Sequence, residues 1–220
     1  MRGLFVTGTD TGVGKTVVSG MLLRRYARDL PMRYWKPIQT GIEQDDDTGT
    51  VTALAGRMVR SPLVAGVRLP RPLSPHLSAR LAGQAIDLDA LEAIANQQSA
   101  DERFIVEGAG GVLVPITESA LMADLIARLG LPAIVVARTT LGTINHTLLT
   151  VEALRARGLE VAGVVMNGSP NPENREAIAT FGRVDVLGEI PPLALVDATS
   201  IEDCAAAFDP DGRLADTWLR

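Results

Sequence analysis

The chain has 220 residues, of which 46% are hydrophobic and only 4% aromatic, and its formal net charge at pH 7 is −5. The acidic balance argues against nonspecific binding of nucleic acid, and the single cysteine, Cys204, excludes an intramolecular disulfide and favours a reducing compartment. No apolar run has transmembrane length, and the first residues resemble a strand rather than a signal peptide, so we expect a cytoplasmic protein without a membrane partner.

Short aliphatic segments alternate with helical ones along the chain. In chain order the sequence predicts a strand over 3–8, a helix over 15–30, a strand over 32–37, a helix over 48–59, a helix over 86–100, a strand over 103–111, a helix over 121–130, a strand over 131–138, a helix over 143–158, a strand over 159–168, a helix over 172–182, a strand over 184–191 and a last helix over 199–208. This alternation predicts an α/β fold, with a single domain over 1–220 built on a doubly wound, mainly parallel sheet with helices on both faces. Ligands bind such sheets at the carboxyl ends of the strands, so functional residues are expected directly after each strand.

The segment GTDTGVGKT, residues 8–16, follows the first predicted strand and leads into the first helix. It departs from the pattern G-x-x-x-x-G-K-[ST] because Thr9 stands where the first glycine is required. The strand-to-helix context still favours a phosphate-binding loop, in which backbone N–H groups and a helix N-terminus face bound oxygens. Lys15 would then neutralise the β- and γ-phosphates, and the hydroxyl of Thr16 would hold Mg²⁺. The alternative is an ordinary strand-to-helix turn.

Two charged residues stand at the ends of other predicted strands. Lys36 precedes Pro37, which favours extended backbone and would project the ammonium from the carboxyl edge of the sheet. Beside a phosphate loop this cation is a candidate for stabilising transferred charge, whereas alone it would be an ordinary surface lysine. Glu107 ends an apolar run and precedes GAGG, residues 108–111, which favours a metal ligand or a water-orienting acid over an exposed loop carboxylate.

The acidic run of residues 45–47 has two interpretations. Asp47, together with Thr48, is a candidate to cap the helix over 48–59, which is a common role for aspartate. Asp47 is equally a candidate second carboxylate for Mg²⁺, which prefers one or two carboxylates together with phosphates and water. The sequence leaves both roles open.

Weaker signals lie further along the chain. Asn167 follows a strand and is a candidate to bond an adenine edge, although Asn-Gly is also a favourable turn. Thr143 is a candidate cap for the helix over 143–158. His146 would then lie on the surface of that helix, and His76 is expected to be structural or exposed.

Taken together, these motifs resemble one family, the dethiobiotin synthetases of the biotin pathway. The resemblance rests on VTGTDTGVGKT at 6–16, KPIQTG at 36–41, SPH at 74–76, VEGAGG at 106–111, LGTINH at 141–146, Asn167 and GEIP at 188–191. It spans nearly the whole chain and implies a P-loop NTPase-like fold. It also implies an ATP- and Mg²⁺-dependent ligase that joins CO₂ to 7,8-diaminononanoate and releases dethiobiotin, ADP and phosphate. The expected intermediates are a carbamate and a carbamic–phosphoric anhydride.

The resemblance implies roles for individual residues. Lys15, Lys36 and Thr11 would surround the carbamate and the transferred phosphoryl group, and Thr16, Asp47 and Glu107 would hold Mg²⁺. The implied nucleotide contacts are Gly12, Val13, Gly14, Lys15, Thr16, Val17, Asp47, Glu107, Gly108, Ala109, Gly110, Asn167, Gly168 and Pro191. The implied contacts to the diamine are Thr40, Gly111, Leu141, Gly142, Thr143 and Asn145, the last four acting across the interface of a homodimer.

Three other functions stay open from the sequence. An ATP-dependent amidating enzyme of the cobyrinic-acid type would carry a glutaminase domain with a nucleophilic cysteine, whereas Cys204 lies near the end of this chain. A partitioning-type ATPase switch would carry an extra lysine early in its phosphate loop, where this chain has Asp10. A non-catalytic nucleotide-binding subunit would keep the phosphate loop and lack turnover.

Overall fold

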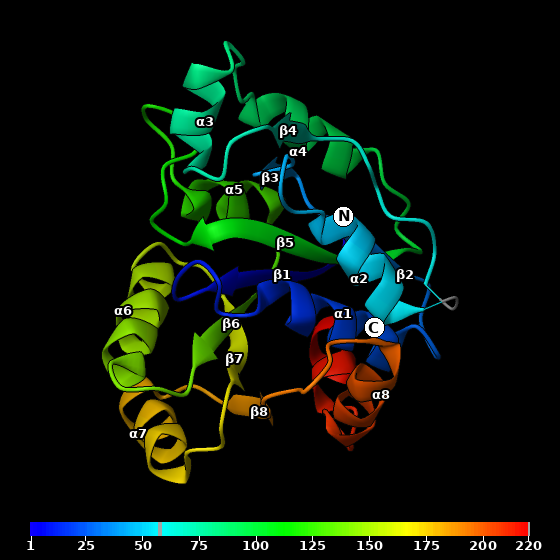
Figure 1. Ribbon diagram of the computed structural model, residues 1–220, viewed down its shortest axis with the longest axis vertical. Helices are drawn as coiled ribbons and strands as arrows, with labels where there is room; N and C mark the ends of the chain where they lie inside the picture. Colours follow the sequence, from blue (N-terminus) through cyan, green and yellow to red (C-terminus); the bar gives the residue numbers. More distant parts are fainter. Residues whose placement is uncertain (57–58, 220) are drawn as a thin grey trace.

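The computed structural model describes residues 1–56 and 59–219 (Figure 1). Within these residues six strands form one parallel sheet in the order β2-β5-β1-β6-β7-β8, and two short strands form a separate parallel pair, β3-β4. The strands are β1 Gly3–Gly8, β2 Met32–Trp35, β3 Ile38–Thr40, β4 Val67–Leu69, β5 Arg103–Gly111, β6 Ala133–Arg138, β7 Val161–Asn167 and β8 Val186–Ile190. The helices are α1 Lys15–Tyr26, α2 Asp47–Ala55, α3 Pro75–Leu81, α4 Leu88–Asn96, α5 Met122–Leu129, α6 Thr143–Arg155, α7 Pro172–Gly182, α8 Ala198–Ala207 and a short π-helix, η1 Ala215–Leu219.

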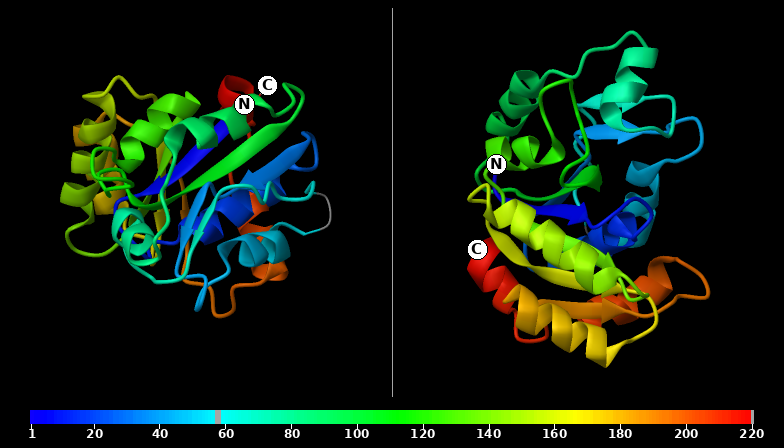
Figure 2. Two further views of the ribbon diagram at one scale, coloured as in Figure 1. Left: turned by 90° about the horizontal axis from the view of Figure 1, so that it is seen from above. Right: turned by 90° about the vertical axis from the view of Figure 1, so that its left-hand side faces the viewer.

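Helices cover both faces of the main sheet. Because successive residues of a strand point to opposite faces, Phe5 and Phe104 belong to one hydrophobic cluster, together with residues of α4, α5, α6 and α7. Leu4 and Ile105 belong to a second cluster, together with residues of α1, α2, α8 and η1. Figure 2 shows α6 and α7 side by side on one of these faces. The predicted doubly wound parallel sheet is therefore confirmed.

Strand β1 lies at the centre of the sheet, between β5 and β6. The chain passes from β1 outward to β2, returns to β5, and then crosses to β6 on the other side of β1. The strand order thus reverses at β1, and the carboxyl end of such a strand is where open α/β sheets bind ligands. The segment predicted to bind phosphate begins at this point.

The structure differs from the sequence predictions in the segments between the main strands. Strand β2 ends at Trp35 rather than at 37, because Pro37 has no N–H to donate to a ladder. The chain then enters β3, which pairs with β4; both have three residues, too few for a periodic pattern. Helix α3 was likewise not predicted, and η1 follows α8, which is therefore not the last helical segment.

The predicted helix over 48–59 corresponds to α2, and its residues 57 and 58 lie outside the described residues. Helix α1 ends at Tyr26, four residues earlier than predicted.

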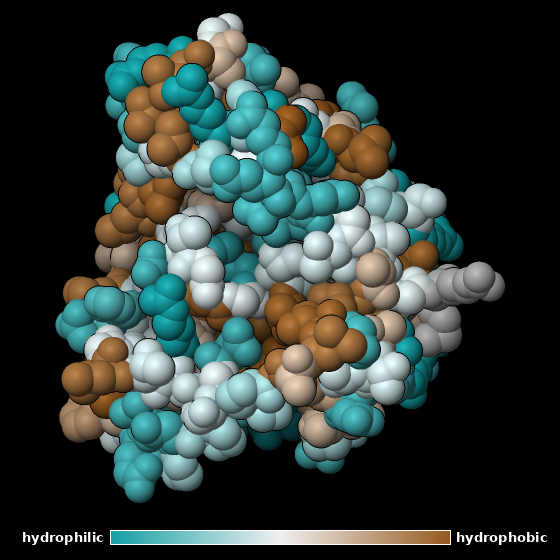
Figure 3. Space-filling view, viewed as in Figure 1, coloured by the Kyte–Doolittle hydropathy of each residue, from teal (hydrophilic) through white to brown (hydrophobic). Residues whose placement is uncertain are grey.

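Hydrophilic and hydrophobic residues are interspersed over the face of the molecule shown in Figure 3. In the part of the chain that the structure describes, no helix has the length and apolar character needed to cross a membrane.

Candidate functional site

The turn between β1 and α1 has the backbone shape of a phosphate loop. Gly12 and Gly14 have φ values of 68° and 99°, which residues with a side chain rarely adopt. A Cβ on Gly14 would lie 2.0 Å from Nδ2 of Asn167, so this position requires glycine. The N–H of Thr9 donates to the carbonyl of Val136 at 3.0 Å, which extends the pairing of β1 with β6. The departure from the glycine pattern at Thr9 therefore falls before the turn.

Two positively charged side chains, those of Lys15 and Arg138, bind backbone carbonyls of the loop. Nζ of Lys15, which is buried, donates to the carbonyl oxygen of Asp10 at 3.1 Å. Burial lowers the pKa of Lys15 from its ordinary value. Arg138, at the end of β6, donates to the carbonyl of Thr11 at 2.8 Å and pairs with the carboxylate of Asp10 at 3.2 Å. These contacts fix the carbonyls of two consecutive loop residues, Asp10 and Thr11.

Glu107 is the centre of the site and has no exposed surface. Its Oε1 accepts from Nζ of Lys36 at 2.8 Å and from Oγ1 of Thr16 at 3.1 Å. Its Oε2 accepts from Oγ of Ser19 at 2.8 Å and from the hydroxyl of Tyr34 at 3.1 Å. The donors come from α1, from β2 and from the residue that follows β2. The exposed loop carboxylate considered from the sequence is therefore wrong.

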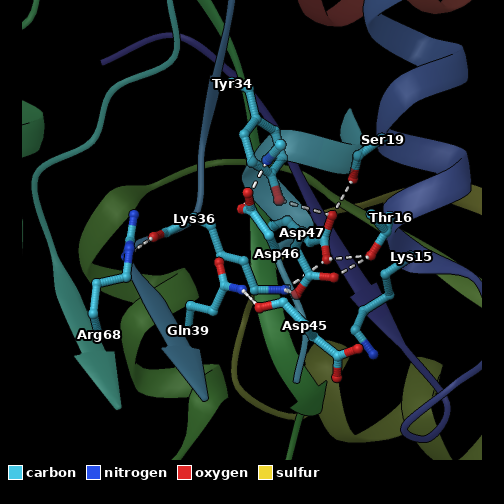
Figure 4. Close-up of polar contacts among 12 residues, drawn as sticks. Lys15, Thr16, Ser19, Tyr34, Lys36, Gln39, Asp45, Asp46, Asp47 and Arg68 are labelled. Carbon is cyan, nitrogen blue, oxygen red and sulfur yellow. Dashed lines mark hydrogen bonds and ion pairs between the residues drawn. The ribbon is translucent and has the colours of Figure 1, made fainter. Parts of the chain in front are cut away.

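The acidic run divides its roles between neighbouring residues (Figure 4). Asp46 is the N-cap of α2, and its side chain accepts from the N–H of Gly49 at 2.8 Å. Asp47 is the first residue of the helix; it pairs with Nζ of Lys36 and accepts from Oγ1 of Thr16 at 3.0 Å. The cap predicted at Asp47 and Thr48 is thus wrong by one residue. Because Asp46 takes the capping role, Asp47 is directed into the site.

Lys36 lies between two carboxylates, although only 5% of its surface is exposed. Burial alone would lower the pKa of Lys36, but the charges of Glu107 and Asp47 outweigh it and raise this pKa above its ordinary value. Burial would likewise raise the pKa of Asp47, but Lys36 and Thr16 lower it below its ordinary value. Both groups are therefore held in their charged forms, and the surface-lysine interpretation of Lys36 is wrong.

The small sheet fixes the backbone around Lys36. Arg68, on β4, donates from Nη1 to the carbonyl oxygen of Lys36 at 2.9 Å. Gln39, on β3, is buried and donates from Nε2 to the carbonyl of Asp45 at 3.0 Å. Figure 4 shows Arg68 and Gln39 on the small-sheet side of Lys36. The pair β3-β4 thus connects the lysine with the acidic run.

A cavity of about 670 Å³ opens beside these groups. Its lining contains the six residues predicted to meet the transferred phosphoryl group and the metal, namely Thr11, Lys15, Thr16, Lys36, Asp47 and Glu107. It also contains five of the predicted nucleotide contacts, namely Gly12, Gly14, Gly108, Ala109 and Gly110. Thr40 and Asp45 also line it. Pro72, Leu73 and Val114 add apolar side chains to the lining. The cavity is therefore lined by both charged and apolar side chains.

A second cavity, of about 470 Å³, lies on the other side of Gly12. Asn167 and Gly168 line it, as does Val13. Nδ2 of Asn167 donates to the carbonyl of Val13 at 3.0 Å, so this side chain contacts the phosphate loop directly. Pro191 is exposed and does not line the cavity, whereas Pro192 does. The adenine contact predicted for Pro191 thus has no support in this arrangement.

Residues 141–145, at the start of α6, line neither cavity, although Thr139 and Thr140 just before them line the second one. Leu141 is fully exposed, and Gly142 and Asn145 are exposed as well. Thr143 is buried and donates to the carbonyl of Arg138 at 2.5 Å, while Gly142 is the N-cap. The capping role predicted for Thr143 is therefore wrong. Val17 and Gly111 also line neither cavity.

The two histidines agree in part with expectation. His146 is exposed on α6, as predicted. His76 is half-buried in the first turn of α3, and its Nδ1 is buried without a hydrogen-bond partner. Neither histidine lies among the residues that line the two cavities.

Three oxygen-bearing side chains converge in a way that fits a small hard cation. Oγ1 of Thr16 lies 3.0 Å from Oδ1 of Asp47 and 3.1 Å from Oε1 of Glu107. The described residues contain no group of three or more His, Cys, Asp or Glu that could hold a metal alone. A cation here would therefore complete its shell with water and phosphate oxygens, as Mg²⁺ does.

Ser19 and Tyr34 are the site residues that the sequence analysis missed. Ser19 stands three positions after Thr16, so the two hydroxyls share one face of α1. Tyr34 stands two positions before Lys36, a spacing that places two side chains on one face of an extended chain. Both spacings were readable, but neither residue type signals a carboxylate partner before that carboxylate is known to be buried.

The sequence is similar to a family model and to several named proteins. The AAA domain family model matches residues 2–200. The ATP-dependent dethiobiotin synthetase BioD of Paramagnetospirillum magneticum is 53% identical, covering 91% of this chain and 93% of that protein. The enzyme of the same name from Nitrobacter hamburgensis is 43% identical, covering 99% and 97%. The biotin biosynthesis bifunctional protein BioCD of Bordetella avium is 49% identical over 91% of this chain but 42% of its own length.

Solved structures with similar folds are more distant in sequence. A ParA family ATPase from Chlorobium tepidum gives a TM-score of 0.59 at 9% identity, covering 94% of this chain and all of that one. The cell division ATPase MinD of Pyrococcus furiosus gives 0.54 at 15% identity, covering 98% and 94%. At such identities the likeness concerns the fold alone, and it agrees with the parallel sheet and phosphate loop described above.

Replacing Lys36 by methionine tests the electrostatic account of the site. In the wild type, the stabilisation from the lowered pKa of Asp47 is complete above the unfolded-state pKa and is lost as the pH falls through the folded-state pKa. Without the ammonium, burial raises that pKa, so Lys36→Met should lose stability as the pH rises. We expect a loss of about 3–5 kcal/mol at about pH 7.5 and a clearly smaller loss at about pH 5, measured by urea unfolding.

Arg128→Met is the matched control. Arg128, on α5, forms exposed ion pairs with Asp89 and Glu92 on α4, outside the candidate site. The substitution should change stability little at either pH. An equal loss for Lys36→Met at both pH values would contradict the proposed charge balance.

Proposed function

This chain belongs to the family of ATP-dependent dethiobiotin synthetases, and from that premise we propose that it closes the cyclic urea of dethiobiotin from 7,8-diaminononanoate and CO₂. The relative at 53% identity over nine-tenths of the chain supports the family. The observation that supports the chemistry best is the meeting of Lys15, Lys36 and the Asp47–Glu107 pair at one cavity beside the phosphate loop. The same relatives disfavour the amidating and switch functions, which no feature of the site favours.

The reaction needs positive charge more than it needs a proton carrier. A carbamate oxygen attacks the γ-phosphorus of ATP, and ADP leaves with the electrons of the broken P–O bond. The second amine then attacks the carbonyl carbon of the mixed anhydride, closes the ring and expels phosphate, and the amine's proton passes to solvent. Negative charge therefore accumulates on oxygens in both steps, which is where preorganised cations act.

Lys15, Lys36 and Thr11 supply the groups that this charge requires. Lys15 already points its ammonium at a loop carbonyl, and phosphate oxygens would replace that acceptor. Lys36 is kept charged by its two carboxylates and faces the same cavity, so it is available to the carbamate and the transferred phosphoryl group. Thr11, exposed at the cavity, can donate from its hydroxyl.

Thr16, Asp47 and Glu107 would hold Mg²⁺. When bound, that ion would neutralise charge on the β- and γ-phosphate oxygens. The three side chains meet within hydrogen-bond distance of Thr16 and come from α1, α2 and β5. Lys36 helps to lower the pKa of Asp47, so this carboxylate need lose no proton to receive a cation.

The remaining nucleotide contacts follow the loop and the second cavity. Backbone N–H groups of residues 12–17 would bind the phosphates, and the residues 108–110 would approach from β5. Asn167 and Gly168 would meet the adenine; the amide nitrogen of Asn167 is engaged by Val13, which leaves the carbonyl oxygen to accept from the exocyclic amine. Pro192, which lines the second cavity, would take the adenine contact that was implied for its neighbour Pro191.

The diamine would lie in the larger cavity, with Thr40 toward its amines and the apolar side chains along its hydrocarbon chain. Gly111 directly follows the lining residue Gly110, and we propose that it approaches the diamine through its backbone. Leu141, Gly142, Thr143 and Asn145 do not reach this cavity within one chain, so we propose that they act from the second subunit of a homodimer. There the N-terminus of α6 would bind the substrate carboxylate. Residues 1–220 would form one catalytic domain of a cytoplasmic enzyme with small-molecule substrates and no nucleic-acid partner.

The direct test of the function is ADP release from ATP, Mg²⁺ and bicarbonate, with and without 7,8-diaminononanoate. We expect ADP release to require the diamine and dethiobiotin to appear by mass spectrometry, because the γ-phosphate has no acceptor before the carbamate forms. ATP hydrolysis that ignores the diamine would contradict the proposal and favour a nucleotide switch.

The three neighbouring aspartates allow a matched test of the metal site. Asp47→Asn should raise the Mg²⁺ concentration for half-maximal ADP formation about tenfold or more, because it removes a charged ligand. Asp46→Asn should follow the wild-type curve, since asparagine caps a helix as well as aspartate does. Asp45→Asn should also follow it. A shift in Asp45→Asn with a normal curve for Asp47→Asn would move the metal ligand to Asp45.

Subunit mixing tests the shared site. Asn145→Asp places a negative charge where the substrate carboxylate would bind, and Lys15→Ala disables the phosphate loop; each variant alone should be inactive. Co-refolded together, they should recover about one quarter of wild-type activity, since half of the dimers carry one intact site. Lys15→Ala mixed with Lys36→Ala should recover none, because both residues serve the same subunit's cavity. Equal recovery in the two mixtures would argue against the shared site.

A further inference from the structure

The Glu107 carboxylate is bound differently on its two oxygens. The donors to Oε1, Lys36 and Thr16, both line the reaction cavity. The donors to Oε2, Ser19 and Tyr34, do not line it and are themselves buried. We propose that Ser19 and Tyr34 are positioning residues, which fix the carboxylate from behind so that Oε1 alone serves the cation and the reacting groups. This inference rests on the proposed Mg²⁺ role of Glu107.

The two hydroxyls saturate the rear oxygen. An ionised carboxylate oxygen offers two lone pairs, and Oε2 already accepts from Ser19 at 2.8 Å and from Tyr34 at 3.1 Å. A cation at Oε2 would have to displace one of these hydroxyls, and a buried hydroxyl without a partner is costly. Oε1 also accepts from two donors, Lys36 and Thr16, but both line the cavity and both are shared with Asp47. A cation that enters from the cavity can therefore replace these donors at Oε1 without leaving a buried hydroxyl that has no other partner.

The Glu107 carboxylate needs such a constraint because rotation about the last torsion of its side chain costs little energy. The last torsion of glutamate has a broad energy profile, so the backbone does not set the plane of the carboxylate. On the cavity side, Lys36 is shared with Asp47, and the single proton of Thr16 is shared between the two carboxylates. The cavity-side contacts alone therefore leave the plane loosely defined. Ser19 and Tyr34 serve Glu107 only and come from two rigid elements, α1 and β2.

The same helix supplies a ligand and a positioning group. Thr16 and Ser19 are one turn apart on α1, which begins at the phosphate loop. One rigid helix, α1, thus sets the position of the loop and of the Thr16 hydroxyl. Through Ser19, the same helix helps to set the plane of the Glu107 carboxylate. Groups of this kind behind metal ligands commonly change metal affinity by about 10- to 100-fold when they are removed.

Binding of ADP with and without Mg²⁺, measured by calorimetry, tests the proposal without turnover. In the wild type Mg²⁺ should strengthen ADP binding. In Tyr34→Phe and in Ser19→Ala this gain should fall about tenfold, while the affinity for ADP alone should change less than about twofold. Tyr26→Phe is the matched control, because Tyr26 is also buried and donates to a carboxylate, Asp209, at 2.8 Å, outside the site. It should leave the gain unchanged.

The outcomes separate the possible failures. No Mg²⁺ gain in the wild type would contradict the metal site itself and the inference with it. A wild-type gain that persists in Tyr34→Phe and Ser19→Ala would overturn the positioning role alone and leave Glu107 as a ligand. A gain that falls equally in Tyr26→Phe would show a general effect of buried hydroxyl loss and would also overturn it. Should Tyr34→Phe not fold, Ser19→Ala carries the test through the other hydroxyl.

Discussion

One buried ammonium between two carboxylates holds the candidate site together. Lys36 contacts Glu107 from β5 and Asp47 from α2, and all three groups have left most of their water. Removing one member of such a cluster leaves an unmatched charge in a poorly polarisable surrounding, which is far more costly than removing an exposed pair. The backbone elements that carry these residues are therefore fixed relative to one another by the same contact that prepares the chemistry.

Several otherwise separate features become understandable from this cluster. The chain leaves the main sheet at Pro37, directly after the lysine, and forms the small sheet whose Arg68 binds the lysine's carbonyl. Asp46 caps α2, so the helix begins where Asp47 can reach the cluster. Ser19 and Tyr34 complete the shell of Glu107 on the side away from the cavity. Local structure around the site thus serves a small number of charged contacts.

The sequence predicted the features that depend on local rules. The phosphate loop, Lys36 and Glu107 were found because strand ends at one edge of a parallel sheet converge, and that geometry follows from the alternation of elements. The candidate cap was placed at Asp47 rather than at Asp46, because both residues have the chemistry of a cap and only the position of Lys36 decides between them. Strands β3 and β4 escaped notice because three residues give no pattern. Thr143 was mistaken for a cap because its hydroxyl donates to a carbonyl of the preceding segment, that of Arg138, and does not bond its own helix.

The contacts within the phosphate loop have a consequence for the free energy of ligand binding. Lys15 and Arg138 hold the carbonyls of Asp10 and Thr11, and the glycines at 12 and 14 already have their left-handed backbone angles. The loop therefore has its shape before a nucleotide arrives, and little conformational entropy is left to lose on binding. The lysine exchanges one carbonyl acceptor for phosphate oxygens while the backbone stays in place. Discrimination between nucleotides would then fall to the groups around the base, since the phosphate groups are common to all nucleoside triphosphates.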